Sequence, residues 1–275
     1  MRVCVAHATM LAQRGDRLQL AWQQGGSQRS DCRTNSLLGY PYMPQPLSRV
    51  APGAGMFVGS NSASETFRQY PSLAVLAMEA IATWSLVEYS MLELFIELAG
   101  GSKEKAGAIY LALEIQSAKA AAVAALICDC KKEHRDLFYC INDLRKSRKI
   151  ERDKLAHWMW GRSNGIKDGF LLCDPKNLIS AMEPFRTVSV NLSNIATVKQ
   201  SVEDTMFVYK EKDFSDMIAA NQQLSEYFAK FQYVVSFPPL DLDNTVYESL
   251  LAEPAIADTA RRRAARGQIP PTEAL

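Results

Sequence analysis

The sequence predicts a mainly α-helical protein, an antiparallel helical bundle with a small β-hairpin insertion and disordered tails. Three observations lead to this prediction. Apolar residues recur every three or four positions over long segments between residues 72 and 235. Within that region, a few short stretches change to the apolar and alternating patterns that are typical of strands. Both ends of the chain are rich in proline, glycine or small residues, which favours disorder.

The N-terminal segment 1–68 is expected to be a disordered or poorly ordered extension. It shows no sustained apolar period, and glycine, serine and proline are frequent between Gly25 and Gly55. Met56 opens the segment that leads into the first strong helix. We therefore hypothesise that residues 1–55 are not essential and that Met56 is an alternative start.

The middle segment 69–237 is expected to fold as one helical domain. Its first helix should begin after Pro71 and end at Gly100, and Ser102 is the expected N-cap of the second. Asp213 is the expected cap of the last helix. The four expected helices span about 72–99, 103–130, 133–161 and 214–235.

Strands are expected between the third and fourth helices, at about 168–210. The run Gly169–Cys173 is short and apolar and ends at Asp174-Pro175. Residues 205–210 are a second strand candidate, and residues 187–192 alternate as a strand or an extended segment. We expect these strands to form a small hairpin. The C-terminal segment 238–275 is expected to be a flexible tail whose arginines are solvated (Arg261, Arg262, Arg263 and Arg266).

Composition excludes several classes of function. The net charge is only +1, so any affinity for nucleic acid must come from local clustering of charge. The six cysteines form no Cys-x-x-Cys pair and the chain has three histidines, so we expect no metal site, no cofactor and free thiols that are mostly buried. The longest apolar run, Ala120–Cys128, is too short to span a bilayer, and the start lacks a signal-peptide pattern. We expect a soluble cytoplasmic protein.

The most distinctive stretch is Arg145–Gly161, which reads RKSRKIERDKLAHWMWG. Its first half is basic and its second half is apolar and aromatic, with His157 between the two halves. This combination of positive charge, a proton-transfer group and aromatic surface occurs at no other place in the sequence. Six of its first ten residues are basic: Arg145, Lys146, Arg148, Lys149, Arg152 and Lys154.

The residues from Arg152 to His157 resemble the Arg-x4-His motif of the HEPN superfamily, a group of small α-helical bundles that includes many metal-independent endoribonucleases. Asp153 fits the polar position that follows the arginine in that motif. The resemblance covers roughly residues 70–165 and leaves the hairpin, the fourth helix and both tails unmatched. It implies RNA as partner, a homodimer in which two motif copies meet, and a stress, toxin or phage-defence setting in which an antitoxin or another protein can bind.

The resemblance also implies roles for individual residues. His157 would be the general acid and base, since an imidazole ordinarily titrates near pH 6.5. Arg152 would hold the phosphate with a two-pronged contact, and Asp153, one helical turn before His157, would orient the imidazole. The neighbouring residues Arg145, Arg148 and Lys149 are candidate contacts to the RNA backbone.

An alternative is a non-catalytic helical module for protein interaction or dimerisation. Arg152 and His157 lie about 140° apart around an ideal helix, so they do not share one narrow face. His157 would then be a packed histidine beside Trp158 and Trp160, and these indoles would pack rather than stack on bases. The basic run would be a solvated face paired with nearby acidic residues: Glu133, Asp136, Asp143 and Glu151.

Overall fold

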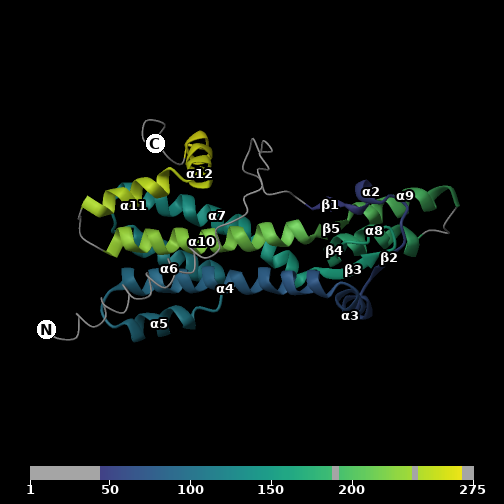
Figure 1. Ribbon diagram of the computed structural model, residues 1–275, viewed down its shortest axis with the longest axis horizontal. Coiled ribbons are helices and arrows are strands. Elements are labelled where there is room, and N and C mark those ends of the chain that lie inside the picture. The colour runs from purple at the N-terminus through teal and green to yellow at the C-terminus, as the bar shows by residue number, and fades with distance from the viewer. Residues whose placement is uncertain (1–43, 188–191, 237–240, 268–275) are drawn as a thin grey trace, which may run out of the picture. The chain divides into compact units, whose positions relative to one another are not determined.

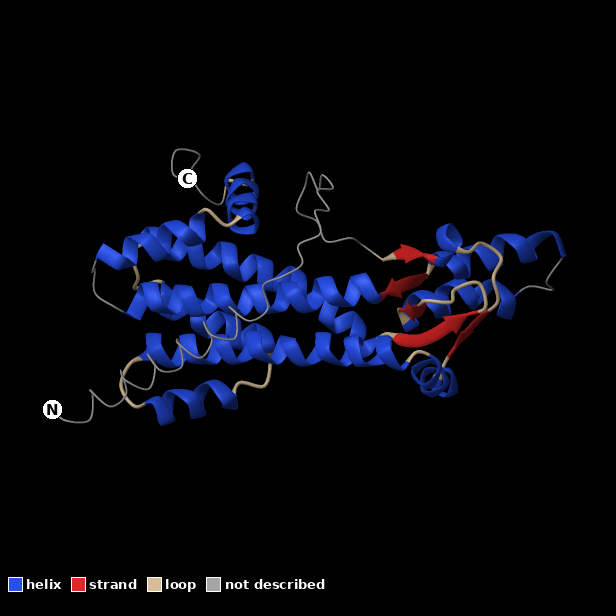
Figure 2. Ribbon diagram, in the orientation of Figure 1, coloured by secondary structure: helices blue, strands red, loops and turns tan. Residues whose placement is uncertain are grey.

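The computed structural model describes residues 44–187, 192–236 and 241–267, all within one compact unit, Gly39–Leu275. The described residues are mostly helical, with one small antiparallel sheet of five strands (Figure 2). The prediction of a mainly helical protein is confirmed. The expected hairpin is replaced by a larger sheet, and the expected tails contain ordered elements, as the following paragraphs show.

The largest part of the core lies among the long helices α4 (Pro71–Ala99), α7 (Lys132–His157) and α10 (Glu211–Ser236). Helices α4 and α10 lie side by side (Figure 1), and both also pack against α7. Trp84 of α4 and Phe138 of α7 are buried in this core together with aromatic residues of α10. The predictions of helices at about 72–99 and 214–235 are confirmed, because their apolar periodicity matches the side that is buried.

Local residues set the ends of these helices. Pro71 occupies the start of α4, where its missing N–H costs nothing, and Gly100 ends the helix with a positive φ of 63°. Asp213 lies in the first turn of α10, and its carboxylate accepts the backbone N–H of Lys210 at 2.7 Å. The buried amide of Asn221 in α10 donates to the carbonyl of Ala80 at 3.1 Å, which fixes α10 against α4.

The predicted second helix is wrong as a single helix. It consists of α5 (Lys103–Ala112) and α6 (Gln116–Ile127), separated by an extended link, although Ser102 caps α5 as expected with its Oγ accepting from Lys105 N. On one straight helix Tyr110 and Val123 would point about 140° apart. The link lets both side chains reach the core, whereas three apolar side chains on or beside it are exposed: Ile109, Leu111 and Ile115.

The predicted third helix ends too late. Helix α7 stops at His157, Trp158 is extended, and Met159 begins strand β3 (Met159–Ser163). The indole Nε1 of Trp160 donates to the carbonyl of Leu155 at 3.2 Å and so satisfies one of the free carbonyls at the helix end. Backbone pairing of β3 with strands on both sides outweighs the helical spacing that the sequence shows there.

The sheet has the strand order β1-β5-β4-β3-β2, and every neighbouring pair is antiparallel. The middle strand β4 (Gly169–Cys173) is buried on both faces, which explains its uninterrupted apolar run. Phe170 and Leu172 face a cluster shared with α4 and α10, while Leu171 and Cys173 face a second cluster that includes residues of α2, α8 and α9.

Strands β4 and β5 (Met206–Lys210) confirm two of the predicted strands, but they do not form a hairpin. Helices α8 (Pro175–Thr187) and α9 (Leu192–Asp204) connect them. The expected strand or extended segment at 187–192 is wrong at its two end residues, Thr187 and Leu192, which are helical. Residues 188–191 lie outside the described residues.

Part of the segment expected to be disordered belongs to the folded unit. It forms β1 (Gln45–Pro46), α2 (Leu47–Val50), β2 (Met56–Val58) and α3 (Ser60–Gln69). Leu47 is fully buried, so the hypothesis that residues up to 55 are not essential conflicts with their packing. Residues 1–43 lie outside the described residues.

The expected flexible C-terminal tail contains two helices, α11 (Asp241–Leu251) and α12 (Pro254–Ala265). Leu250 and Ile256 are buried in the helical core, and α12 packs against α7. The prediction of a flexible tail was wrong because α12 consists mainly of small and charged residues. Its apolar side is narrow and is stabilised only by packing against the rest of the protein. Residues 268–275 lie outside the described residues.

Thiols and apolar helices give two further outcomes. Cys140 and Cys173 are buried free thiols, as expected, whereas Cys128 is an exposed one. Burial raises the pKa of the Cys140 thiol to about 11, which makes it unreactive at neutral pH.

Helix α4 is long and apolar enough to cross a membrane by length and composition alone. One of its sides packs in the core.

Candidate functional site

The basic segment lies on the second half of α7 and ends beside the sheet. His157 is the last residue of α7 and is exposed, so its imidazole is open to solvent. Arg152, about 1.4 turns earlier, is half-buried, with 31% of its side chain exposed. The two candidate catalytic residues are therefore both accessible at the same end of one helix, and they point in different directions around it.

Asp153 contacts the cations beside it rather than His157. Its Oδ1 lies 3.3 Å from Nη1 of Arg152, and its Oδ2 is hydrogen-bonded to Nζ of Lys149 on the preceding turn. The carboxylate thus orients Arg152 and Lys149 in this structure. Nε of Arg152 is buried and has no hydrogen-bond partner among the described residues, so this guanidinium has unused donor capacity.

Three arginines of α7 lie on one side of the helix and continue the line of its buried apolar residues. Arg145 is only 6% exposed, and its Nε donates to Oδ1 of Asn142 at 2.9 Å. Burial lowers the pKa of Arg145 and of Arg148. The opposing effect comes from Tyr110 and Glu88 at Arg145, and from Glu151 and Asp216 at Arg148. Arg145 is therefore held inside the helical core, whereas Arg148 and Arg152 are only partly buried.

Sequence reasoning missed a polar cluster behind this segment. Glu151 accepts from Nζ of Lys154 at 2.8 Å and is hydrogen-bonded to the buried hydroxyl of Tyr209 in β5. Burial, together with the charges of Glu151 and Asp213, raises the pKa of Tyr209, so this phenol stays neutral. Burial also raises the pKa of Asp213, whose Oδ1 lacks a partner among the described residues. No local sequence signal joins Glu151 to β5.

The aromatic residues after His157 pack within the protein. Trp160 contacts the rings of Phe67 and Phe170 at centroid distances of 5.1 and 5.5 Å. The ring of Trp158 lies 5.8 Å from the ring of Phe207, and Nζ of Lys154 lies 5.4 Å from the centroid of the Trp158 ring. Packing accounts for both indoles, as the alternative interpretation of the sequence expected.

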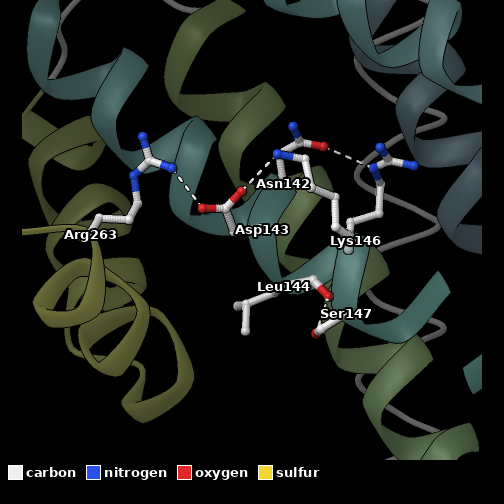
Figure 3. A network of polar contacts seen from close by, with 7 residues as sticks. Asn142, Asp143, Leu144, Lys146, Ser147 and Arg263 are labelled. Carbon is white, nitrogen blue, oxygen red and sulfur yellow. Dashed lines mark hydrogen bonds and ion pairs between the residues drawn. The ribbon is translucent and has the colours of Figure 1, made fainter. Parts of the chain in front are cut away.

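The first half of α7 is joined to α12 through a charge cluster (Figure 3). Asp143 lies between Arg263 of α12, at 2.6 Å, and Lys146 of α7, at 2.9 Å. Although burial opposes it, hydrogen bonding to these two cations lowers the pKa of Asp143. Arg263, expected in a solvated tail, is mostly buried and lies over the ring of Tyr139. The carboxylate of Asp143 lies between two cations and links α7 to α12, which gives this cluster a structural role.

Comparisons with known proteins returned no match: no family model, no curated protein and no solved structure is significantly similar to this chain. The resemblance to HEPN domains therefore stays a prediction from the sequence. Within residues 44–187, 192–236 and 241–267, no group of three or more His, Cys, Asp or Glu side chains is placed to hold a metal ion.

Proposed function

We propose that this protein binds RNA and cleaves it without a metal ion at the C-terminal end of α7. The observation that carries the proposal is the exposed His157, five residues after a half-buried Arg152 with a free buried donor. We further propose that α4, α7 and α10 form a HEPN-like helical bundle. The packing of α10 on α4 and on α7 supports that arrangement.

The proposed reaction uses the 2′-hydroxyl of the RNA as the nucleophile. His157 removes the proton from this hydroxyl, and the oxygen attacks the adjacent phosphorus. The bond from phosphorus to the 5′ oxygen breaks, and the imidazolium returns its proton to that leaving oxygen. The products are a 2′,3′-cyclic phosphate and a 5′-hydroxyl, so atoms and charges balance without another reactant.

Arg152 would stabilise the extra negative charge of the phosphorane. A phosphate oxygen that approaches Arg152 would compete with Asp153 for the guanidinium, which a partly exposed pair permits because water weakens it. Lys149 lies on the same side of α7 and would contact a neighbouring phosphate. The burial of Arg145 leaves it out of this contact surface, so the proposal uses Lys149 and Arg148 alone.

A non-catalytic interaction module is the second candidate. It is favoured by the contacts of Asp153, which is bound to Lys149 and Arg152 rather than to His157. The packing of Trp158 and Trp160 also removes an aromatic platform for bases. The two candidates differ in their prediction for RNA binding. Only the RNA-binding candidate predicts an RNA affinity that depends on salt through the basic side chains of α7.

Replacing Lys149 with glutamine should reduce the salt dependence of RNA binding. Loss of one phosphate contact lowers the slope of log affinity against log salt by about 0.7 for single strands. Fluorescence polarisation of a labelled single-stranded RNA over a salt series measures this slope. Lys103→Gln on α5 is the matched control, because Lys103 is exposed and far along the chain from the site. Equal slopes for wild type and Lys149→Gln would contradict the proposed contact.

A further inference from the structure

Helix α4 carries an exposed apolar stripe on the side opposite its buried residues. Val75 is 65% exposed, Met78 64%, Leu86 49% and Tyr89 59%, and Ala82 between them is also exposed. On an ideal helix these five residues fall within about 80° of one another. Such a stripe on a helix whose other side is already packed in a core is typical of a second interface.

The stripe is symmetric about its central residue. Val75 and Tyr89 lie seven residues to either side of Ala82, and Met78 and Leu86 lie four residues to either side. A two-fold interface requires that residue i meets residue j and j meets i, which an antiparallel pair of identical helices provides. We propose that a second copy of this chain packs antiparallel on α4, with the two-fold axis at Ala82.

The charges of α4 support this register. The helix carries four glutamates and no lysine or arginine. In the antiparallel register Glu79 lies opposite Ser85 of the second copy, and Glu93 lies opposite Pro71. A parallel pair would instead place every glutamate beside its own copy, where like charges repel. A bilayer is also a poorer occupant, because it would have to bury Glu79 beside the stripe.

Dimensions set the expected strength of the dimer. The stripe runs over 15 residues from Val75 to Tyr89, a rise of about 21 Å along the helix. The small side chain of Ala82 at the crossing point lets the two backbones come close. One helix face is less than the roughly 800 Å² per partner of standard interfaces, so we expect a dissociation constant in the micromolar range.

The α4 dimer differs from the dimer that the HEPN resemblance implies. Leu155, two residues before His157, packs with Leu73 and Ala77 on the buried side of α4. The stripe faces away from that side, so pairing through α4 keeps the two His157 sites apart. The inference therefore does not depend on the proposed ribonuclease activity, and its test does not use RNA.

Charge variants of the full chain test both the surface and the register. In the antiparallel register residue 78 of one copy meets residue 86 of the other. Met78→Lys or Leu86→Glu alone should raise the dissociation constant at least about tenfold, because each leaves a charge facing an apolar side chain. The double variant places Lys beside Glu twice and should recover dimerisation. Ile179→Glu on α8, an equally exposed apolar position, is the control and should leave the dimer unchanged.

Sedimentation velocity of the purified full chain over a concentration series measures the dissociation constants. The inference is supported by a wild-type dimer, weaker single variants and recovery in the double variant. A monomeric wild type over the micromolar range would overturn it, as would a dimer that the single variants leave intact. A folded double variant that does not recover dimerisation would overturn the antiparallel register. Binding of a monomeric protein to lipid vesicles through the stripe would overturn the proposed occupant.

Discussion

Replacing Phe170 with alanine should lower the free energy of unfolding by about 3–5 kcal/mol, the largest stability change we expect from a single substitution. Phe170 is fully buried in the middle strand of the sheet. Its ring lies 5.5 Å from that of Trp160 and 6.0 Å from that of Phe214. The substitution therefore opens a cavity where the sheet meets α10 and the end of α7. Urea denaturation followed by circular dichroism measures the change.

Phe57→Ala is the matched control for this prediction. Phe57 lies in the edge strand β2 of the same sheet and is 43% exposed. Its loss should cost about 1 kcal/mol or less, since little buried contact is removed. If Phe170→Ala cost no more than Phe57→Ala, the aromatic cluster at the junction would not be the packed core that the ring distances indicate.

Replacing His157 with alanine should reduce the rate of RNA cleavage by about 10²- to 10⁴-fold, the range that general acid–base groups contribute. Its side chain is exposed at the end of α7, so the substitution should leave the unfolding transition unchanged. Cleavage of a labelled RNA under single-turnover conditions gives the rate. A loss of rate together with a loss of stability would indicate damage to the fold rather than to the chemistry.

His134→Ala provides the control on the same helix. His134 lies near the start of α7, with its ring 5.8 Å from that of Tyr247, and it is more than 20 residues before His157. The His134→Ala variant should cleave RNA at the wild-type rate. Equal rates for the wild type and both variants would exclude His157 as the proton-transfer group.

The sequence predicted the long helices well because their local pattern and their tertiary environment agree. The apolar periods of α4 and α10 coincide with their buried sides. The break between α5 and α6 was missed, since neither Leu113 nor Ile115 is a residue that interrupts helices. The edge strands were missed because their pairing is distant in the chain, as between Met56 and Ser163.

The candidate site was predicted in its position but only partly in its contacts. Charge density and the spacing of Arg152 and His157 can be seen in the sequence, and both residues lie at one helix end. The burial of Arg145 depends on how α7 packs in the core, which no spacing along α7 shows. The partner of Asp153 was also wrongly expected, because Lys149 lies four residues before it and competes successfully with His157.

Cleavage of a mixed, end-labelled RNA pool by the purified full chain in excess EDTA tests the central claim most directly. Metal-independent chemistry at Arg152 and His157 predicts cleavage that EDTA does not reduce, with 2′,3′-cyclic phosphate and 5′-hydroxyl ends. An RNA whose 2′-hydroxyls are replaced by hydrogen should remain intact, because the nucleophile is missing. No cleavage by a folded wild-type protein, or cleavage that EDTA abolishes, would contradict the claim and favour the interaction module.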